Sequence, residues 1–424
     1  MSDIAAIRDA VHDAAAAARS AGAGLEQAGE DTIRGVLLDM AQNLLARSAE
    51  LQAANRRDVE AAEASGMSPG LVDRLVTGDA RITGMADQLE VLANTPAEPR
   101  IRKVRDLDGG TVVLEKRRAV GVLGANFEAR PNVTVDMASQ SLRSRNACVL
   151  RTGAAALRTA EALVDLVIGP ALEGRGLSGD CVRLLRTPDR AAAEQLVQHP
   201  DGIPLVILRG SGDTTRMLAQ KAAQAGVAAL AHADGGGVLY VHPAADRDTV
   251  TRLIGESTDR LGVCNRLNLL LVDTAVFDDL VPRIRAQLAA QDPAIELVGP
   301  SPVRPLGWEW ALDDANNATV TVAPVTGPLE AAEIANRETS GLAATIATED
   351  DDAAGEFLAA YAGTGGFHNR TTRLLDGFKL LAVPETGINV GRGPGPRGPV
   401  TFRDLWIRQY LTVPTATAAR LLDA

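Results

Sequence analysis

The chain of 424 residues has few aromatic side chains and few cysteines. Aromatic residues make up 3% of it, so its cores must be built mainly from alanine, valine, leucine and isoleucine. The three cysteines, Cys148, Cys181 and Cys264, are too few and too scattered for a disulfide framework or a zinc site. The five histidines show no metal-ligand spacing either. We therefore expect neither a bound metal nor a stabilising disulfide.

An excess of positive charge and long apolar runs are also missing. The net charge of -11 argues against nucleic-acid binding, which normally needs a basic face. No stretch reaches the roughly 18 consecutive apolar residues that a membrane-spanning helix requires. The first twenty residues hold no basic segment leading into an apolar one. We therefore expect a cytoplasmic protein that binds small molecules rather than nucleic acid or membranes.

What the chain does contain is an alternation of helices with short apolar strands. Its length exceeds what one hydrophobic core usually supports, so we expect two or three domains. The spacing of apolar residues predicts helices over Ala5–Ala18 and Ile33–Leu51. The stretch Thr111–Phe127 is rich in β-branched residues and is interpreted as paired strands. From Ala147 onward strands and helices alternate, which is typical of parallel sheets covered on both faces.

A second alternating stretch follows, and the tail differs from both. The apolar run Leu267–Asp273 predicts a strand, and Ala275–Ala290 predicts the helix after it. The segment Gly391–Pro399 cannot form a regular helix or strand. Its prolines remove the amide donors that a phosphate loop needs, so we interpret it as a structural turn. The residues Trp406–Val413 resemble a final strand.

The sequence lacks the Gly-x-Gly-x-x-Gly fingerprint of dinucleotide-binding folds. Glycine-rich loops nevertheless follow three predicted strands, at Arg151–Ala155, Arg209–Thr215 and His232–Gly237. In the second loop, backbone N–H groups and the positive end of the next helix can face a pyrophosphate. A plain strand-to-helix turn, capped by its serine or by Asp213, explains the same residues. Both interpretations stay open on the spacing alone.

Cys264 is the candidate nucleophile among the three cysteines. Cys148 and Cys181 each lie within an apolar strand and are expected to be inert core residues. Cys264 instead precedes Asn265 in a loop before a strongly apolar strand. A thiol in such a loop can be partly exposed, and its thiolate attacks acyl groups. A lone buried, passive cysteine is the alternative that spacing alone leaves open.

The run Gly121–Gly153 resembles the signature of the γ-glutamyl phosphate reductase (glutamate-5-semialdehyde dehydrogenase) family, a branch of the aldehyde dehydrogenase superfamily. The Glu-Ala-Arg-Pro-Asn-Val-Thr-Val-Asp run of that family stands intact from Glu128 to Asp136. Further similar stretches are Met67–Leu75, the Leu-Arg-Gly-Ser-Gly run, the Val-Cys-Asn around Cys264 and the Pro-Arg-Gly-Pro near the end. The resemblance covers essentially the whole chain.

The resemblance implies an aldehyde dehydrogenase-like α/β fold with two parallel-sheet domains and a small β arm. The cofactor-binding domain would comprise residues 1–101 and 125–245, and the catalytic domain with Cys264 residues 246–390. The arm would comprise residues 102–124 and 391–424, with strands near Thr111–Ala119 and Trp406–Val413. It would pair with a neighbouring subunit in a homodimer or homotetramer.

The family reduces an acyl phosphate to an aldehyde with NADPH and releases phosphate. The resemblance therefore implies reduction of γ-glutamyl phosphate, or of a close analogue, through a thioester on Cys264. NADP(H) is favoured over NAD(H), and no metal is needed. By resemblance, Asn132 and the backbone N–H of Cys264 are the donors that stabilise the oxyanion. The nicotinamide delivers hydride to the thioester.

The resemblance also assigns contacts to cofactor and substrate. The predicted cofactor contacts are Arg151, Thr152, Gly153, Arg209, Gly210, Ser211, Gly212, Asp234, Gly235, Gly236 and Glu309. Glu309 falls near the acid that touches the nicotinamide ribose in many members of the superfamily. The predicted substrate contacts are Glu128, Arg130, Asn265, Asn369, Arg370, Thr371, Thr372 and Arg373.

Departures from the family pattern cluster on the substrate side. Asn369–Leu374 replaces the usual Asn-Ala-Ser-Thr-Arg-Phe, so Arg370 puts a cation where a methyl group is usual. Asn268-Leu269 replaces the usual Glu-Thr after the Cys-Asn stretch. This pattern predicts a divergent relative that acts on another acyl phosphate or aldehyde. Because arginine suits carboxylate groups, Arg370 and Arg373 would favour a substrate with more negative charge or a longer reach.

Two other functions remain open on the sequence. One is the oxidation of an amino-aldehyde to an acid, which needs a base to activate water; Asp234 is the candidate nearby acid. The other is a non-catalytic role as an oligomeric partner. The retention of Cys264, Asn265 and Asn132 counts against that second role.

Overall fold

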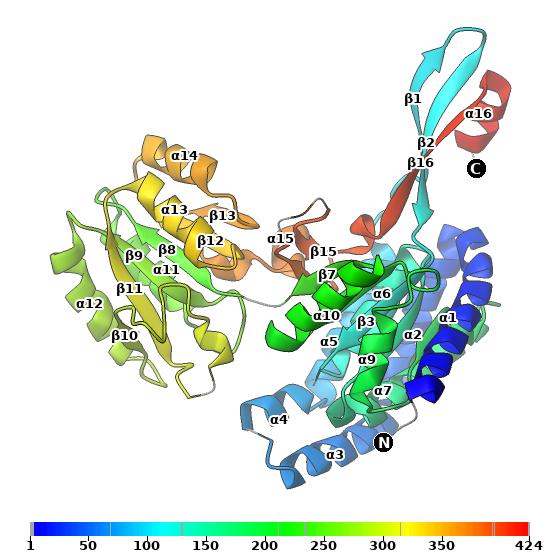
Figure 1. Cartoon of the computed structure of the whole chain (residues 1–424), viewed down its shortest axis with the longest axis horizontal. Helices are drawn as coiled ribbons and strands as arrows, with labels where there is room; N and C mark the ends of the chain where they lie inside the picture. The colour runs from blue at the N-terminus through cyan, green and yellow to red at the C-terminus, as the bar shows by residue number, and fades with distance from the viewer. Residues whose placement is uncertain are drawn as a thin grey trace. The chain divides into compact units, whose positions relative to one another are not determined.

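The computed structural model of the chain (Figure 1) describes residues 4–67, 69–128, 130–210, 212–232, 235–313, 315–391, 393 and 395–422. Its contacts divide the chain into two compact units. Unit 1 comprises Met1–Leu230, Val383–Gly387 and Val400–Ala424, and unit 2 comprises Ala231–Ala382 and Ile388–Pro399. Among the described residues, every helix is too short or too polar to cross a membrane.

Unit 1 contains a five-stranded sheet in the order β5-β4-β3-β6-β7. Its strands are β3 (Val122–Phe127), β4 (Ala147–Thr152), β5 (Val182–Leu184), β6 (Leu205–Arg209) and β7 (Ala228–His232). The pairings of β3 with β4 and β6, and of β4 with β5, are parallel. Every residue of β3 and β4 is buried, as expected for strands covered by helices on both faces.

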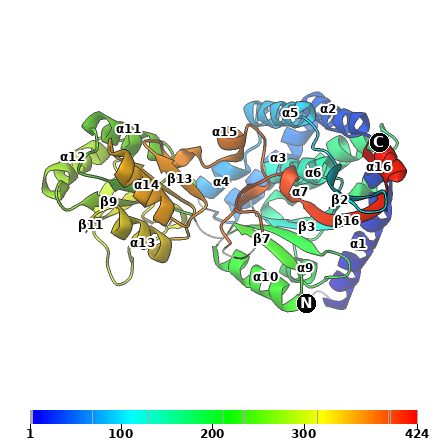
Figure 2. The ribbon, with the colours of Figure 1, turned by 90° about the horizontal axis from the view of Figure 1, so that it is seen from above.

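Helices pack on both faces of this sheet. The helices of unit 1 are α1 (Ile4–Gln27), α2 (Glu30–Ala46), α3 (Ser48–Ala64), α4 (Pro69–Leu75), α5 (Asp79–Asn94), α6 (Asn132–Arg143), α7 (Leu157–Leu163), α8 (Gly169–Glu173), α9 (Arg190–Leu196) and α10 (Gly212–Ala225). Figure 2 shows α2 and α6 on one side of β3 and α9 on the other. One core cluster joins the apolar faces of α2, α5 and α6 to the side chains of β3 and β4.

The small antiparallel sheet has the order β1-β2-β16, with β1 (Ile101–Leu107), β2 (Thr111–Ala119) and β16 (Trp406–Pro414). The predicted pairing of the strands near Thr111–Ala119 and Trp406–Val413 is confirmed, because Trp406 faces Ala119 and Pro414 faces Thr111. A helix that was not predicted, α16 (Thr415–Leu422), follows β16. Its Ala418 packs with Val112 and Leu114 of β2.

The interpretation of Thr111–Phe127 as paired strands is wrong. The segment does form two strands, but β2 belongs to the antiparallel sheet and β3 to the parallel one. Gly121, with a φ of 124°, separates them. That left-handed backbone conformation suits glycine and lets the chain leave one sheet for the other. The hydrophobic pattern of the segment shows strands but not their partners.

Two other local predictions need correction. The helix predicted over Ile33–Leu51 is interrupted, because α2 ends at Ala46 and α3 begins at Ser48. Cys181 lies in a short 3-10 turn before β5 rather than in the strand itself, although it is buried as expected.

Unit 2 contains a six-stranded parallel sheet in the order β10-β11-β9-β8-β12-β13. The strands are β8 (Gly237–Val241), β9 (Leu267–Asp273), β10 (Glu296–Val298), β11 (Thr319–Val325), β12 (Ala343–Ala347) and β13 (Gly365–His368). The helices are α11 (Arg247–Ser257), α12 (Phe277–Ala289), α13 (Pro328–Glu338), α14 (Asp351–Ala360) and α15 (Gly377–Leu381). A two-stranded sheet pairs β14 (Gly387–Asn389) with β15 (Gly398–Val400).

Two core clusters cover the two faces of the unit 2 sheet. One contains apolar residues of α11 and α12, and the other contains those of α13 and α14. The strand predicted over Leu267–Asp273 is β9, with the same bounds. The α/β class, with two parallel-sheet units and a small antiparallel sheet, is confirmed. The cofactor and catalytic roles of the two units stay predictions.

Gln140 fixes the position of α6 within unit 1. Its side chain is fully buried. The Gln140 Nε2 donates to the Pro384 carbonyl oxygen at 3.0 Å, and its Oε1 accepts from the Phe402 N–H at 2.6 Å. One side chain therefore ties α6 to two segments that return to unit 1 late in the chain.

The substitution Gln140→Leu should destabilise the protein because it removes both hydrogen bonds. Each buried polar group left without a partner costs about 1–3 kcal/mol, so the free energy of unfolding should fall by at least about 2 kcal/mol. Urea-induced unfolding followed by circular dichroism measures this. The control Gln198→Leu, at an exposed position, should change it by less than about 0.5 kcal/mol. Equal effects of the two variants would contradict the role given to Gln140.

Candidate active site

The predicted cofactor loops of unit 1 lie at the carboxyl ends of its parallel strands. The chain runs from β3 outward to β4 and β5, then returns to the other side of β3 as β6. Open α/β sheets bind ligands outside the carboxyl ends of their strands, where the strand order reverses in this way. Glu128 follows β3, Gly153 follows β4 and Gly210 follows β6. The topology therefore brings these loops to one edge of one sheet.

The two arginines of these loops have different surroundings. Arg151 is 4% exposed, and its guanidinium donates to Asn126 Oδ1 at 3.3 Å and to the carbonyl oxygens of Pro188 and Asp189 at 3.2 Å. Burial lowers the pKa of this guanidinium. Arg209 is only partly buried and lies against Gly387, where a Cβ would stand 3.2 Å from its Nε. Arg151 therefore serves the loop before α9, whereas Arg209 is the more accessible cation.

The other residues of these loops differ in the space around them. Thr152 is fully buried, but a Cβ on Gly153 would meet nothing within 4 Å, so the backbone there borders open space. A Cβ on Gly210 would stand 3.3 Å from the carboxyl carbon of Glu128. Glu128 thus lies against the turn before α10, where its negative charge would repel a phosphate group. Gly212 begins α10, and Ser211 lies outside the described residues.

Asn132, the predicted oxyanion donor, begins α6 and is exposed. Its Nδ2 donates to Oδ2 of Asp136 at 3.0 Å, because residues four apart share one face of a helix. Burial raises the pKa of Asp136 to about 6. The positive charges of Arg209 and Arg130 and the hydrogen bond from Asn132 each lower it by less. The exposed Arg130 and the partly buried Arg209 thus both act on the carboxylate that orients Asn132.

Cys264 lies in the turn immediately before β9 and is partly exposed. Its carbonyl oxygen accepts from the Gly236 N–H at 2.6 Å, and the Arg266 carbonyl oxygen accepts from the Gly237 N–H at 2.7 Å. A Cβ on Gly235 would stand 2.7 Å from the Cβ of Cys264. The glycines predicted to touch the cofactor therefore pack against the predicted nucleophile. Asp234 lies outside the described residues.

The other two cysteines are buried in unit 1. Burial raises the pKa of the Cys148 thiol to about 12 and that of the Cys181 thiol to about 11. Because the thiolate is the reactive form, neither is suited to attack a substrate. Of the three cysteines, Cys264 alone is partly exposed.

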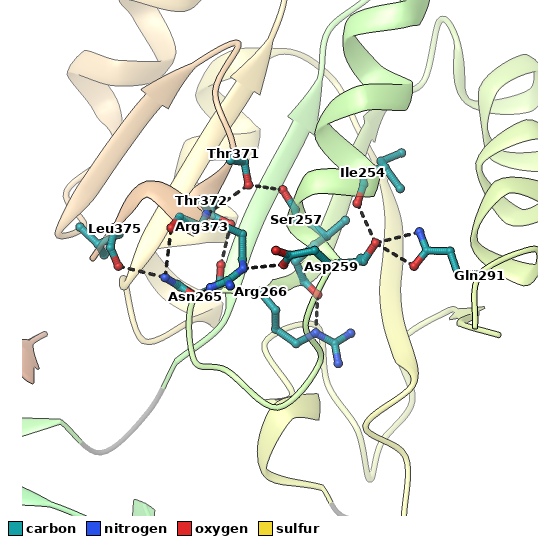
Figure 3. Close-up of polar contacts among 12 residues, drawn as sticks. Ile254, Ser257, Asp259, Asn265, Arg266, Gln291, Thr371, Thr372, Arg373 and Leu375 are labelled. Atoms are coloured by element: carbon teal, nitrogen blue, oxygen red, sulfur yellow. Dashed lines mark hydrogen bonds and ion pairs between the residues drawn. The ribbon is translucent and has the colours of Figure 1, made fainter. Parts of the chain in front are cut away.

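The turn that holds Cys264 and Asn265 is braced by the segment 371–375 (Figure 3). Asn265 Nδ2 donates to the Leu375 carbonyl oxygen at 3.0 Å, and its own carbonyl oxygen accepts from Thr372 Oγ1 at 2.9 Å. Arg373 Nη1 donates to Asn265 Oδ1, and Arg373 Nε donates to Asp259 Oδ1 at 2.8 Å. The predicted substrate residues Asn265, Thr372 and Arg373 thus hold one another in place.

The rest of the predicted substrate segment has separate surroundings. Thr371 Oγ1 lies 2.7 Å from Ser257 Oγ on α11. Asn369 accepts from the Thr348 N–H at 3.0 Å and donates to the Thr348 carbonyl oxygen at 2.8 Å, so it fixes the end of β12. Arg370 is exposed. Since Arg373 is 12% exposed and paired with Asp259, Arg370 is the arginine of this segment that is accessible to a carboxylate.

The surroundings of Glu309 in unit 2 include Arg266, which the sequence did not single out, and Asn268, which stood out only as a departure from the family pattern. Arg266 is fully buried, and its guanidinium donates to the carbonyl oxygens of Leu267, Asn317 and Thr319. Burial lowers the pKa of Arg266 to about 10, although the negative charge of Glu309 acts to raise it. Asn268 contacts the backbone on both sides of Glu309. The sequence feature that could have pointed to these two residues is the presence of an arginine and an asparagine at the start of an apolar strand.

Two other kinds of site find no support. Among the described residues, no group of three or more histidine, cysteine or acidic side chains is arranged to hold a metal. A surface hollow in unit 1 is lined partly by α1, α8 and β5, away from the strand-end loops. Its arginines are already paired, Arg183 with Asp180 and Arg186 with Asp165. These pairs leave neither arginine as a free counter-charge for a ligand.

Comparisons with known proteins identify relatives of the fold. The aldehyde dehydrogenase family model matches residues 4–295. The crystal structure of gamma-glutamyl phosphate reductase from Thermotoga maritima is 26% identical, with 95% of this chain and 98% of that one covered and a TM-score of 0.86. The corresponding yeast protein, from Saccharomyces cerevisiae, is 21% identical, with 95% and 96% covered and a TM-score of 0.51. An acetylating aldehyde dehydrogenase from Geobacillus thermoglucosidasius is 15% identical, with 97% and 98% covered and a TM-score of 0.72. The expected aldehyde dehydrogenase-like fold is confirmed.

Asp136 should make the stability of the protein depend on pH. Its folded pKa of about 6 lies above the value of about 3.9 for an unfolded chain, so the folded state binds the proton more tightly. The stability that this proton provides is present below the unfolded pKa and is lost as pH rises through the folded one. Between about pH 5 and about pH 7, the free energy of unfolding of wild type should fall by about 1 kcal/mol relative to Asp136→Asn. Urea denaturation of both proteins measures this, and parallel pH profiles would contradict the shift.

Proposed function

The chain belongs to the aldehyde dehydrogenase family and is an oxidoreductase, and we propose that it reduces an acyl phosphate to an aldehyde through a thioester on Cys264. The observation that carries the proposal is the partly exposed Cys264 in the turn before β9, packed against the glycine loop 235–237. The family implies a nicotinamide cofactor. When bound, that cofactor supplies the hydride for the reduction.

The residues of the chain suit such a cofactor at two places. In unit 1, the carboxyl edge of the sheet offers the accessible Arg209 and the open space beside Gly153. In unit 2, the Glu309 carboxylate is an acceptor for ribose hydroxyl groups. We favour NADP(H), with Arg209 as the cation for the 2′-phosphate, because Arg151 is already engaged by Asn126, Pro188 and Asp189.

The first half of the reaction is an acyl transfer to sulfur. The Cys264 thiolate attacks the acyl carbon and forms the C–S bond, and the C–O bond to phosphate breaks so that phosphate leaves with the electron pair. We assign stabilisation of the oxyanion to the Asn132 amide and the backbone N–H of Cys264. The hydrogen bond from Asn132 to Asp136 fixes the orientation of that amide.

The second half is the release of the aldehyde. Once the thioester carbon has been reduced, Cys264 would hold a thiohemiacetal oxyanion. The collapse of this oxyanion re-forms the carbonyl group, breaks the C–S bond and returns Cys264 to the thiolate. The brace of Asn265 by Thr372, Arg373 and Leu375 holds the sulfur-bearing turn in one place through both halves. Such preorganisation is how a site positions reacting groups.

The substrate that we propose is γ-glutamyl phosphate or a close analogue. The support is the likeness to gamma-glutamyl phosphate reductase, which is also the family of the Glu128–Asp136 run. Arg370 is the group that we assign to a carboxylate at the far end of the substrate, since it is exposed while Arg373 is paired with Asp259. An arginine at this position favours an analogue with more negative charge.

We also propose that the chain forms a homo-oligomer through its antiparallel sheet. Both β1 and β16 are edge strands of that sheet. Ile407 and Tyr410 of β16 are 47% and 57% exposed. Exposed edge strands with apolar side chains are surfaces on which other chains pair.

Replacement of the nucleophile should abolish turnover without removing cofactor binding. Cys264→Ala should lower the rate of reduced-nicotinamide oxidation by at least about a thousandfold, because no thioester can form. The dissociation constant of the cofactor, measured by its fluorescence, should stay the same. Cys181→Ala is the control for thiol loss elsewhere and should stay active. Turnover by Cys264→Ala at more than about 5% of the wild-type rate would disprove the covalent mechanism.

The reverse reaction should depend on an added oxyanion. Because phosphate or arsenate must release the acyl group from Cys264, oxidation of the aldehyde should be slow in phosphate-free buffer and increase with phosphate concentration. The absorbance of the reduced nicotinamide measures the rate, and the acid product is identified by mass spectrometry. Full-rate oxidation to the free acid without phosphate would instead support an amino-aldehyde dehydrogenase.

A further inference from the structure

The pairing of β8 with β9 contains a bulge at Asn268. Gly237 pairs with Leu267, but the next residue of β8, Val238, pairs with Leu269. Asn268 is therefore the additional residue on β9. A bulge of this kind turns a side chain away from the regular alternation of the strand, and bulges are frequent beside active sites. The Asn268 side chain is nevertheless almost fully buried.

The Asn268 amide uses both of its polar ends on the backbone that flanks Glu309. Its Nδ2 donates to the Trp308 carbonyl oxygen at 2.5 Å, and its Oδ1 accepts from the Trp310 N–H at 2.9 Å. One side chain thus fixes the peptide groups immediately before and after Glu309.

The same amide also lies against the glycine loop. A Cβ on Gly236 would stand 3.2 Å from Asn268 Nδ2, and the Gly236 N–H donates to the Cys264 carbonyl oxygen. Asn268 therefore contacts both the loop that packs on Cys264 and the segment that carries Glu309.

Arg266, two residues before Asn268, is a cation on which the charge of Glu309 acts. Its guanidinium is buried and donates to three backbone carbonyl oxygens, which carry no net charge. Burial lowers the pKa of this arginine, and the charge of Glu309 raises it. The start of β9 therefore fixes the backbone on both sides of Glu309 through Asn268.

We propose that Asn268 is a positioning residue for the nicotinamide cofactor, because it holds Glu309 where the Glu309 carboxylate accepts hydrogen bonds from the cofactor ribose. This inference rests on the proposed function, in which Glu309 contacts the ribose. Asn268 does not act on the reacting carbon. Its loss changes the affinity for the cofactor through Glu309 and leaves the affinity for the acyl substrate unchanged.

Two of the three tryptophans report directly on this segment. Trp308 and Trp310 flank Glu309, whereas Trp406 lies in β16. In a Trp406→Phe background, tryptophan emission therefore comes only from the residues that Asn268 holds. Binding of reduced nicotinamide cofactor is then measured by quenching of that emission, without any turnover.

The test is Asn268→Ala in this background, compared with Asn336→Ala. Asn336 is a matched control in unit 2, because its amide donates to the Ala360 carbonyl oxygen at 2.9 Å and accepts from the Ala362 N–H at 2.8 Å. Asn268→Ala should raise the dissociation constant of NADPH about tenfold and shift the tryptophan emission of the free protein. Its KM for the acyl substrate should stay the same. Asn336→Ala should change neither the emission nor the dissociation constant.

A second variant at Asn268 and a variant at Glu309 distinguish failure of this inference from failure of the proposed function. Asn268→Asp has the same size but cannot donate to the Trp308 carbonyl oxygen, so it should also weaken NADPH binding. It serves as the test if Asn268→Ala does not fold. Glu309→Gln should weaken NADPH binding at least as much. If Glu309→Gln weakens binding but both Asn268 variants bind like wild type, the inference fails and the proposed function stands. Equal weakening by Asn336→Ala would also overturn it. The Cys264→Ala assay tests the proposed chemistry independently of these outcomes.

Discussion

The close approach of the glycine loop to the Cys264 turn is the constraint on which the unit 2 site depends. Position 235 has no room for a side chain, because Cys264 occupies the space, and a Cβ at position 236 would crowd Asn268. In return, the Gly236 and Gly237 N–H groups satisfy the carbonyl oxygens of Cys264 and Arg266. A turn held by backbone hydrogen bonds keeps its geometry when solvent or ligands around it change. The position of the sulfur is thus set by main chain rather than by flexible side chains.

The residues around this turn form two groups, one on each side of it. On one side, Thr372 and Arg373 hold Asn265, and Asp259 neutralises the arginine. On the other side, the start of β9 holds the segment of Glu309. The nucleophile therefore lies between two hydrogen-bonded polar networks. Such networks are rigid when complete, because each member restricts the orientation of the next.

Much of the architecture could be predicted from the sequence, because apolar strands and their length are local properties. The strand β9 was found with its bounds because five of its seven residues are leucine or valine. The partner of a strand is a long-range property, so β2 and β3 were wrongly paired while the family resemblance supplied the pairing of β2 with β16. The position of Cys264 before β9 was readable for the same local reason.

The contacts of the site were less predictable. Nothing near Arg373 in the sequence shows that Asp259 engages it, since the two meet only through the fold. The burial of Arg266 depends on carbonyl oxygens of residues 317 and 319, about fifty positions later. A charged residue at the start of an apolar strand was a signal, but it did not identify the partner.

The burial of Arg266 also constrains how the sequence can change. Its guanidinium is a donor to the carbonyl oxygens of Leu267, Asn317 and Thr319. A shorter or apolar side chain at position 266 would take this donor away from carbonyl oxygens of the buried residues Leu267 and Thr319, and a buried polar group left without a partner costs about 1–3 kcal/mol. A replacement of Arg266 is therefore tolerated only together with changes in the segment 317–319, although the two lie about fifty positions apart in the sequence.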